Sequence, residues 1–568
     1  MTTPAVQTIW TDLLVGTLAD AGVTTCVISP GSRSTPLVTA LAADGRFALP
    51  TIIDERAAAF YALGVARATG ATVALVCTSG SAAAHYYPAI VEASQANVPL
   101  VAITSDRPPE LQHCGASQTI DQIGMYGRFV RAAFDVGAPV ATEHALRALR
   151  RTVVQAVAAA RGPRPGPVQL EVPLRKPLES AAPSSDDERA LAAIAQKLRG
   201  ALTVPAPRIA ADPHALAALA ARIAAEPHGV IVAGALPIGF PRAAAFELAR
   251  RTGYPLLAEA SSQLRFAPRD GVVAIDRGDL VLAAKLAPEP SLVIRLGAEP
   301  VAAAWQGAFP RAEHWILADA EWLDPDSRAA HVVVGDVAGT LAAVACERRV
   351  DRAFAQSWLD ADRRAAAAIE HACALHPRSE IDALRAALGA MPASSLVQLG
   401  NSLPIRTVDL ACTGGDRRVI SQRGAAGIDG HVASATGATS AGPVLLVVGD
   451  VAFAHDLGAL LVARQALAPL AIVVIDNAGG RIFDGLPVAK HAPADSFERH
   501  WLTAPAIDPV AVAAALGIRG TRAETPSAIA SAVAAALATA GPTVIHAPVS
   551  PTGARDVRES ALHTLRSP

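Results

Sequence analysis

The sequence predicts an α/β protein made of three doubly wound parallel-sheet domains. At 568 residues the chain is too long for one hydrophobic core. Short apolar runs alternate with helical segments along most of it. Glycine-containing polar turns follow many of these runs, as at the carboxyl ends of buried parallel strands. We place the domains at residues 1–180, 200–350 and 375–568.

The composition excludes several classes of protein. A hydrophobic fraction of 51% with 18% charged residues favours packed domains over disorder, and the net charge of -2 gives no case for nucleic-acid binding. The six scattered cysteines form no CxxC pair, so we expect free thiols rather than a zinc site. With no signal peptide and no apolar run of roughly 20 residues, we expect a cytoplasmic protein without a membrane span.

The first domain opens with a helix over 8–21 and a strand over 26–28. That strand ends in a turn with Ser32 and Arg33, and Thr35 opens the next helix. Backbone amides at a helix start, beside a hydroxyl and a guanidinium group, predict an anion site. An ordinary turn with Arg33 in solvent fits the same residues.

Other strand ends of this domain also carry polar residues. A short strand over 50–53 precedes Glu55, which begins an Ala-rich helix, and a capping role is the default interpretation for an acid there. Polar loops with Arg107 and Gln118 follow a later strand, and such loops commonly hold binding groups. The remaining strands of this domain are expected at 72–77, 99–104 and 166–173.

A polar segment over 180–188 and a proline-rich one over 203–207 predict a linker. The middle domain follows, and its glycines Gly234 and Gly239 do not form a GxGxxG motif. Its strands are expected at 229–233, 292–296 and 314–318. Ala-rich helices over 352–376 lead into the third domain.

The third domain contains two turns that end in acidic or amide residues. Strands over 444–448 and 471–475 flank a helix over 456–465, and Asp450 and Asn477 follow the strands. A parallel β-α-β unit places both turns at one sheet edge. A carboxylate, an amide oxygen and a backbone carbonyl would suit Mg²⁺. An ordinary β-α-β unit with acidic loop ends is the alternative.

Two arginines of this domain follow other strands. Arg406 comes after Asn401 and Ser402, and Arg423 begins a glycine-containing loop. Two guanidinium groups at the same edge would suit a dicarboxylate. Ordinary surface arginines are the alternative for each.

The two turns of the third domain resemble the diphosphate-binding motif of thiamine-diphosphate enzymes, Gly-Asp-Gly followed by Asn-Asn. Two positions depart from it, since Val451 replaces the last glycine and Asp476 the first asparagine. Together the first and third domains resemble the 2-succinyl-5-enolpyruvyl-6-hydroxy-3-cyclohexene-1-carboxylate synthases of menaquinone biosynthesis. The strings that carry this resemblance are SPGSRSTPL, DERAAAFYALG, TSGSAAAHYYPAIVEA, TSDRPPEL, GASQTIDQ, NSLPIR, RGAAGIDG, GDVAFAHD and DNAGGRIF.

The resemblance implies a reaction and an assembly. 2-Oxoglutarate would be decarboxylated on thiamine diphosphate, and the remaining succinyl-semialdehyde carbanion equivalent would add to isochorismate in a 1,4 sense. The implied cofactors are thiamine diphosphate with Mg²⁺ or Mn²⁺. The family architecture implies a homodimer or homotetramer with shared active sites, in a thiamine-diphosphate decarboxylase-like fold.

The resemblance also implies roles for particular residues. Glu55 matches the acid that hydrogen-bonds the aminopyrimidine N1′ of the coenzyme. The other cofactor contacts would be Gly449, Asp450, Asn477, Gly479, Ile428, Ile482, Phe483 and Leu486, with Asp450, Asn477 and the Gly479 carbonyl on the metal. Asn401, Ser402, Arg406 and Arg423 match contacts to the 2-oxoacid and the intermediate, and Ser32, Arg33, Arg107 and Gln118 match the isochorismate side. The implied catalytic residues are Glu55, Gln118, Ser402, Arg406 and Arg423.

One family feature is missing, which leaves alternatives open. The family often has a lysine in the segment aligned with 300–304, where this chain has Ala303, and Arg295 is a possible substitute. Another thiamine-diphosphate-dependent 2-oxoacid decarboxylase or carboligase would share Glu55, Asp450 and Asn477. A non-catalytic protein that kept the fold is a further alternative.

Overall fold

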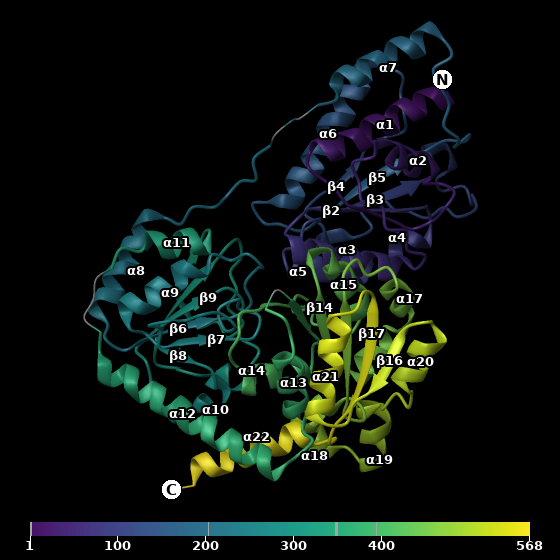
Figure 1. Cartoon of the computed structure of the whole chain (residues 1–568). Coiled ribbons are helices and arrows are strands. Elements are labelled where there is room, and N and C mark those ends of the chain that lie inside the picture. Colours follow the sequence, from purple (N-terminus) through teal and green to yellow (C-terminus); the bar gives the residue numbers. More distant parts are fainter. Residues whose placement is uncertain (1–2, 201, 203, 347–349, 394, 568) are drawn as a thin grey trace. The chain divides into compact units, whose positions relative to one another are not determined.

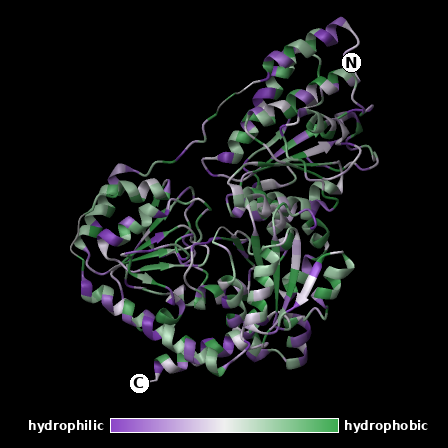
Figure 2. Ribbon diagram, in the orientation of Figure 1, coloured by the Kyte–Doolittle hydropathy of each residue, from purple (hydrophilic) through white to green (hydrophobic). Residues whose placement is uncertain are grey.

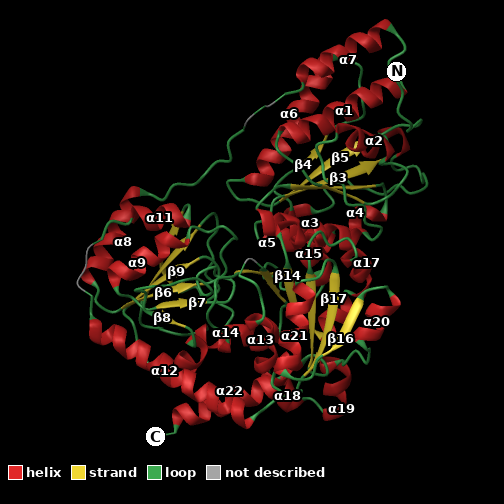
Figure 3. Cartoon of the chain, in the orientation of Figure 1, coloured by secondary structure: helices red, strands yellow, loops and turns green. Residues whose placement is uncertain are grey.

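A computed structural model describes residues 3–200, 202, 204–346, 350–393 and 395–567 (Figure 1). It contains three parallel sheets with helices packed around them, which confirms the predicted fold class (Figure 3). The chain divides into two compact units. Unit 1 comprises 1–207, 422–441 and 461–465, and unit 2 comprises the remainder. The three domain boundaries expected from the sequence stay a prediction.

The first sheet belongs to unit 1 and has the strand order β1-β2-β3-β5-β4, with every pair parallel. Its strands are β1 (Cys26–Ile28), β2 (Val73–Cys77), β3 (Leu100–Asp106), β4 (Ala133–Asp135) and β5 (Pro167–Pro173). The strand expected at 50–53 is wrong, because only Thr51 forms a bridge, to Ile28. Strand β4 was not predicted, because it has three residues, is largely exposed and lacks an apolar run.

Helices of unit 1 cover this sheet. They are α1 (Pro4–Asp20), α2 (Thr35–Asp44), α3 (Glu55–Thr69), α4 (Ser81–His85), α5 (Tyr87–Gln95), α6 (Glu143–Arg161), α7 (Asp186–Leu198) and α15 (His431–Ala438). Residues 180–185 of the expected linker contain no helix or strand, whereas 186–188 begin α7, where Ser185 and Glu188 form a capping box. Leu191 and Ala195 of α7 pack into the core of the first sheet.

The middle sheet has the order β11-β10-β9-β6-β7-β8 and is parallel throughout. Its strands are β6 (Gly229–Ala233), β7 (Leu256–Ala258), β8 (Ala274–Ile275), β9 (Leu292–Leu296), β10 (Glu313–Ala318) and β11 (Ala329–Val334). The helices of this region are α8 (Pro213–Ala225), α9 (Arg242–Thr252), α10 (Gly278–Ala283), α11 (Val337–Ala343) and α12 (Arg352–Leu375).

The third sheet has the order β13-β12-β14-β15-β17-β16, again parallel. Its strands are β12 (Leu396–Leu399), β13 (Arg418–Ser421), β14 (Val444–Gly449), β15 (Leu470–Asp476), β16 (Arg519–Arg522) and β17 (Pro542–Pro548). From β12 the chain continues to β13 on one side of the sheet, and from β14 it continues to β15 on the opposite side. The order therefore reverses between β12 and β14, where doubly wound sheets bind ligands.

The connections of the third sheet differ from expectation in one place. After β14 the chain enters α16 (Asp450–His455) at once and continues into α17 (Leu460–Ala463), so the start expected at 456 is wrong. The other helices here are α13 (Glu380–Gly389), α14 (Leu403–Ala411), α18 (Val488–His491), α19 (Ala494–Phe497), α20 (Pro509–Ala515), α21 (Pro526–Leu537) and α22 (Gly553–Arg566).

Burial follows the hydropathy of the strands. Hydrophobic residues run along most strands of the three sheets (Figure 2). The edge strand β16 is the contrast, since all four of its residues are exposed. Within the described part of the chain, no helix combines the length and the apolar character that crossing a membrane requires.

Candidate functional site

Asp450 lies directly after β14, at the reversal in strand order, and is the first residue of α16. Its side chain is buried, and Oδ2 accepts a hydrogen bond from the Gly479 amide at 2.7 Å. Oδ1 accepts one from the Val451 amide at 2.9 Å. Burial raises the pKa of Asp450 to about 6; the two amides oppose this shift, and neighbouring Asp476 adds to it.

Asn477 lies after β15 and presents an oxygen without a partner. Its Nδ2 donates to Glu380 Oε2 at 3.3 Å, and its Oδ1 is buried with no hydrogen bond. A buried acceptor left without a donor is costly unless a ligand uses it. The amide oxygen therefore fits a cation ligand.

Gly479 completes this group with its backbone. Its φ of +110° is a glycine conformation, and a Cβ there would lie 2.3 Å from the Leu502 carbonyl oxygen. Its own carbonyl accepts from the Arg481 amide at 2.8 Å. A carbonyl has two lone pairs, and one remains for a metal.

The donor set suits a hard divalent cation. Among the described residues, no group of three or more His, Cys, Asp or Glu could hold a metal ion, so a cation here would draw on one carboxylate plus amide and carbonyl oxygens. A cavity of about 150 Å³ adjoins Asp450. It is lined by Asp450, Phe453, Asp476, Ala478, Ala504, Pro505, Ala506, Ile507 and Pro509.

Glu380, which was not predicted from the sequence, contacts the candidate metal ligand Asn477. It is the first residue of α13, is 1% exposed, and fixes the orientation of the Asn477 amide. Burial raises the pKa of Glu380 to about 7, against the hydrogen bond from Asn477. In the sequence it looks like one more acid in the first turn of a helix.

The structure accounts for the departure at Asp476. His546 of β17 lies beside this carboxylate, with Nε2 at 2.8 Å from Oδ2, and the His546 side chain is buried. The Ala478 amide donates to Oδ1 at 3.1 Å. An acid at this position is therefore paired on both oxygens.

The residues after β12 lie on the other side of the strand reversal. Asn401 is buried, and Ser402 adopts φ +70° at the start of α14. Arg406 of the same helix donates through Nη1 to the Ser402 carbonyl at 2.8 Å. The structure thus brings Ser402 and Arg406 together.

The apolar residues expected around the coenzyme lie on the turn after Gly480. Ile482 and Phe483 are half-buried in a 3₁₀ turn (Arg481–Gly485), and Leu486 is exposed. Gly449, expected among the cofactor contacts, ends β14 just before Asp450. A role of these four residues in coenzyme binding stays a prediction.

Unit 1 contains Glu55, Arg423 and Ile428. Glu55 is half-buried at the first position of α3, and its neighbour Asp54 is the cap, accepting from the Arg56 amide at 2.9 Å. The default capping role is therefore filled by Asp54. Ile428 is 37% exposed. Arg406 and Arg423 belong to different compact units, and their convergence stays a prediction.

The first sheet carries the residues expected to bind isochorismate. Ser32 is exposed, whereas Arg33 is buried and donates from Nη1 to the Leu174 carbonyl at 2.6 Å, so an arginine in solvent is wrong. Arg107 is half-buried and its amide donates to Asp106 Oδ1 at 2.7 Å. Gln118 is exposed and donates to the Ser79 carbonyl at 3.0 Å.

A buried polar network lies at the same edge of the first sheet. The carboxyl group of Glu171 on β5 accepts from Thr104, and from Gln122 and Gln169 at 3.1 Å each. Gln122 Oε1 accepts from the Gly80 amide at 2.6 Å. Burial raises the pKa of Glu171 to about 8, and Asp106 adds to this shift.

The segment 300–304, where the family often has a lysine, contains no charged residue in this chain. Ala303 lies in a short 3₁₀ turn. Arg295 on β9 is buried and pairs with Glu299 at 2.6 Å. Its role as a substitute stays a prediction.

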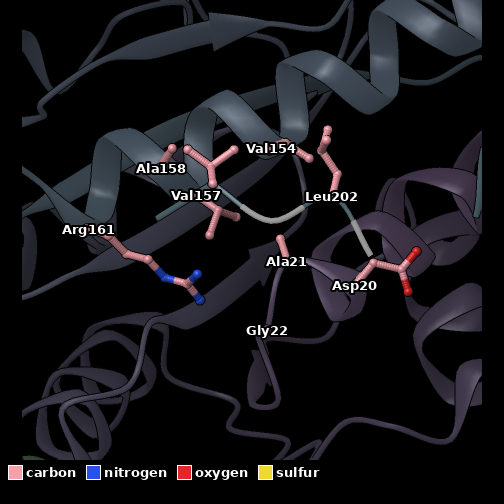
Figure 4. A pocket seen from close by; sticks show the side chains of 9 residues that line it. Asp20, Ala21, Gly22, Val154, Val157, Ala158, Arg161 and Leu202 are labelled. Carbon is pink, nitrogen blue, oxygen red and sulfur yellow. The ribbon is translucent and has the colours of Figure 1, made fainter. Parts of the chain in front are cut away.

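A second cavity of about 150 Å³ lies between α1 and α6, where Arg161 reaches toward Gly22 (Figure 4). Gly22 precedes β1, and Thr72, which binds Arg161 Nε at 3.1 Å, precedes β2. This cavity is therefore at the amino ends of the strands, opposite the edge where α/β sheets bind ligands.

Comparisons with known proteins show which domains the chain contains. Residues 10–125 match the N-terminal thiamine pyrophosphate binding domain of thiamine pyrophosphate enzymes, and residues 408–547 match the C-terminal one. Among solved structures, a benzoylformate decarboxylase from Polynucleobacter necessarius shares the fold, with a TM-score of 0.71 at 19% identity. The alignment covers 97% of this chain and 99% of that one.

Curated relatives are more similar in sequence. The 2-succinyl-5-enolpyruvyl-6-hydroxy-3-cyclohexene-1-carboxylate synthase of Sorangium cellulosum is 39% identical over 95% of this chain and 92% of its own. The protein of the same name from Halobacterium salinarum is 38% identical over 96% of each chain. The chain belongs to the 2-succinyl-5-enolpyruvyl-6-hydroxy-3-cyclohexene-1-carboxylate synthase family, and it is a thiamine-diphosphate-dependent enzyme.

Proposed function

We propose that the protein decarboxylates 2-oxoglutarate and joins the remaining four-carbon unit to isochorismate by 1,4-addition. The products are 2-succinyl-5-enolpyruvyl-6-hydroxy-3-cyclohexene-1-carboxylate and CO₂. The observation that carries the proposal is the buried Asp450 carboxylate, in a chain of this family. This carboxylate lines a cavity and accepts from the amide of Gly479, two residues after Asn477 with its unpartnered oxygen.

Asp450, Asn477 and the Gly479 carbonyl would hold Mg²⁺ or Mn²⁺, and the metal would hold the diphosphate. Glu55 would share a proton with the aminopyrimidine N1′. Asp54 already caps α3, so the Glu55 carboxylate is available for this contact. Thiamine diphosphate, when bound, supplies the electron sink for the loss of CO₂.

Cationic and amide side chains would bind the two anionic substrates. Ser402 and Arg406, which are hydrogen-bonded to each other, would hold 2-oxoglutarate together with Arg423. Ser32, Arg33, Arg107 and Gln118 would receive isochorismate. Arg33 and Gln118 are held by backbone carbonyls, which reduces the ordering needed when substrate binds.

The assembly and compartment form part of the same proposal. Glu55 belongs to unit 1, whereas Asp450 and Asn477 belong to unit 2. A homodimer or homotetramer with shared active sites, working in the cytoplasm, is the arrangement that the family resemblance supports. Sedimentation of the purified protein with and without coenzyme measures the oligomeric state.

A coupled spectroscopic assay tests the reaction. We expect the absorbance of isochorismate to fall only when 2-oxoglutarate, Mg²⁺ and thiamine diphosphate are all present. Turnover of pyruvate without loss of isochorismate would favour another carboligase of the same coenzyme. Calorimetry that detects no binding of thiamine diphosphate with Mg²⁺ would favour a non-catalytic protein.

A further inference from the structure

The loop that carries Arg423 is hydrogen-bonded to a buried acid of another helix. We call residues 422–430 the Arg423 loop; it contains Arg423 and Ile428 and leads into α15. It belongs to unit 1 together with α3 and α5. Its ends are joined, because Gln422 Nε2 donates to the Gly430 carbonyl at 3.1 Å.

Glu92 on α5 supplies the acceptors for this loop. Its side chain is buried, Oε1 accepts from the Gly424 amide at 3.0 Å, and Oε2 accepts from the Ala425 amide at 2.6 Å. Arg67 of α3 donates to the same Oε1. One carboxylate therefore takes the two amides that follow Arg423 and an arginine of the helix that begins with Glu55.

The loop packs closely against α5 at Gly424. A Cβ at Gly424 would lie 2.7 Å from the Glu92 carbonyl oxygen and 2.9 Å from the Ala96 amide. Helix α15, which follows the loop, packs along α3. The backbone after Arg423 is thus held against α5 by a close contact at Gly424 and by charge-assisted hydrogen bonds to Glu92.

We propose that Glu92 is a positioning residue, paired with Arg67, that sets the Arg423 loop in the geometry needed to bind the carboxylate of the 2-oxoacid. The inference rests on the proposed function, in which Arg423 contacts 2-oxoglutarate. A displacement of a substrate-binding group by about 1 Å can reduce the rate about 100-fold, so the support of this loop matters for the reaction.

Glu92→Gln tests the role, because every partner of the carboxylate is a donor and an amide nitrogen would oppose at least one of them. We expect KM for 2-oxoglutarate to rise about tenfold or more, with KM for isochorismate and the affinity for thiamine diphosphate within about twofold. Glu92→Asp keeps the charge and should show a smaller rise. Equal changes in both KM values would overturn the proposal.

Two further variants separate positioning from general stability. Asp44→Asn is the matched control, since Asp44 also accepts from two arginines, Arg46 and Arg199, but far along the chain from the loop. It should leave both KM values unchanged. Gly424→Ala keeps Glu92 yet pushes the loop off α5, and it should raise KM for 2-oxoglutarate as Glu92→Gln does. An unchanged KM in Gly424→Ala counts against the proposal.

Hydrogen exchange gives a readout that does not depend on activity. In the full-length protein, the Gly424 and Ala425 amides should exchange at least about tenfold faster in Glu92→Gln than in Asp44→Asn. Unchanged protection in Glu92→Gln would refute the positioning role even if the enzyme is active. Faster exchange of these amides in Glu92→Gln, in a protein whose wild type never consumes isochorismate, would support the hydrogen bonds from the loop to Glu92. The same result would reject the proposed function.

Discussion

Two buried acids of this protein, Asp450 and Glu171, both have a raised pKa but lie in different surroundings. Glu171 on the first sheet is wrapped by three side-chain donors, Thr104, Gln122 and Gln169. Asp450 of the third sheet accepts two backbone amides and adjoins a cavity. Burial shifts both groups, so a shifted pKa alone does not identify a binding site.

What distinguishes the two acids is the cavity that Asp450 lines. A buried amide oxygen without a partner occurs in both surroundings, at Asn477 after β15 and at Gln169 beside Glu171. The carboxyl group of Glu171 accepts its hydrogen bonds from side chains of the protein itself. We therefore expect substitution of Asp450 to abolish coenzyme binding, and substitution of Glu171 to change how stability depends on pH.

The largest effect is expected for Asp450→Ala, which removes the only carboxylate among the expected metal ligands. We predict no Mg²⁺-dependent binding of thiamine diphosphate by calorimetry and a fall in turnover of at least about 100-fold. Asp416→Ala, at an acid that pairs with Arg242 on the surface, serves as the control. If the affinity for the coenzyme is unchanged in Asp450→Ala, the assignment of the metal site to the third sheet is wrong.

Glu55→Gln should come next in size and should separate activation from binding. We expect kcat to fall about 10²–10⁴-fold, because an amide cannot exchange a proton with the coenzyme, while affinity for thiamine diphosphate stays within about threefold. Asp54→Ala is the adjacent control and should lower stability by about 1 kcal/mol through the lost cap, with little change in kcat. Unchanged turnover in Glu55→Gln would contradict the assignment of Glu55 as the acid that shares a proton with the coenzyme.

Arg406→Ala and Arg107→Ala should distinguish the residues that bind 2-oxoglutarate from those that bind isochorismate. Truncating a desolvated charge partner costs about 2–5 kcal/mol, so Arg406→Ala should raise KM for 2-oxoglutarate at least roughly 30-fold. Arg107→Ala should act on isochorismate instead. Initial rates with each substrate varied in turn measure both effects. If Arg406→Ala changes only the isochorismate kinetics, the assignment of residues to the two substrates is wrong.

The sequence was sufficient for the parts of the fold that depend on apolar runs. Buried strands such as β2 and β15 lie where predicted, because a fully buried parallel strand is a run of Val, Leu and Ile. Exposed β4 and the single bridge at Thr51 were misjudged, since neither follows that pattern. The position of Asp450 could be predicted from its turn, whereas the start of α16 could not.

The supporting residues of the site could not be predicted in the same way. Glu380 and Glu92 are acids within helical segments, and nothing in their neighbours distinguishes them from solvent-exposed helix residues. Their roles arise from contacts across 97 residues to Asn477 and more than 300 residues to Gly424. The burial of Arg33 could not be predicted for the same reason, because its partner is the distant carbonyl of Leu174.

The sign of the Glu171 effect follows from its pKa of about 8, against the usual 4.5. Between these values the folded protein keeps a proton that the unfolded chain has lost. The free energy of unfolding therefore falls as pH rises through this window. Glu110→Gln is a suitable control, because Arg175 lowers the pKa of this exposed acid, and its ionisation state is the same in folded and unfolded protein above about pH 5.

The smallest predicted effect is on this pH dependence. Glu171→Gln keeps the size of the side chain and removes its titration, so the variant should lose less stability than the wild type as pH rises. Calorimetric scans of the full-length protein between about pH 5 and pH 8.5 should show a wild-type Tm that falls about 2–4 °C more than that of Glu171→Gln. Glu110→Gln should parallel the wild type. Parallel curves for Glu171→Gln would mean that its carboxyl group ionises in the folded protein as it does in the unfolded chain, and the contrast with Asp450 would then rest on geometry alone.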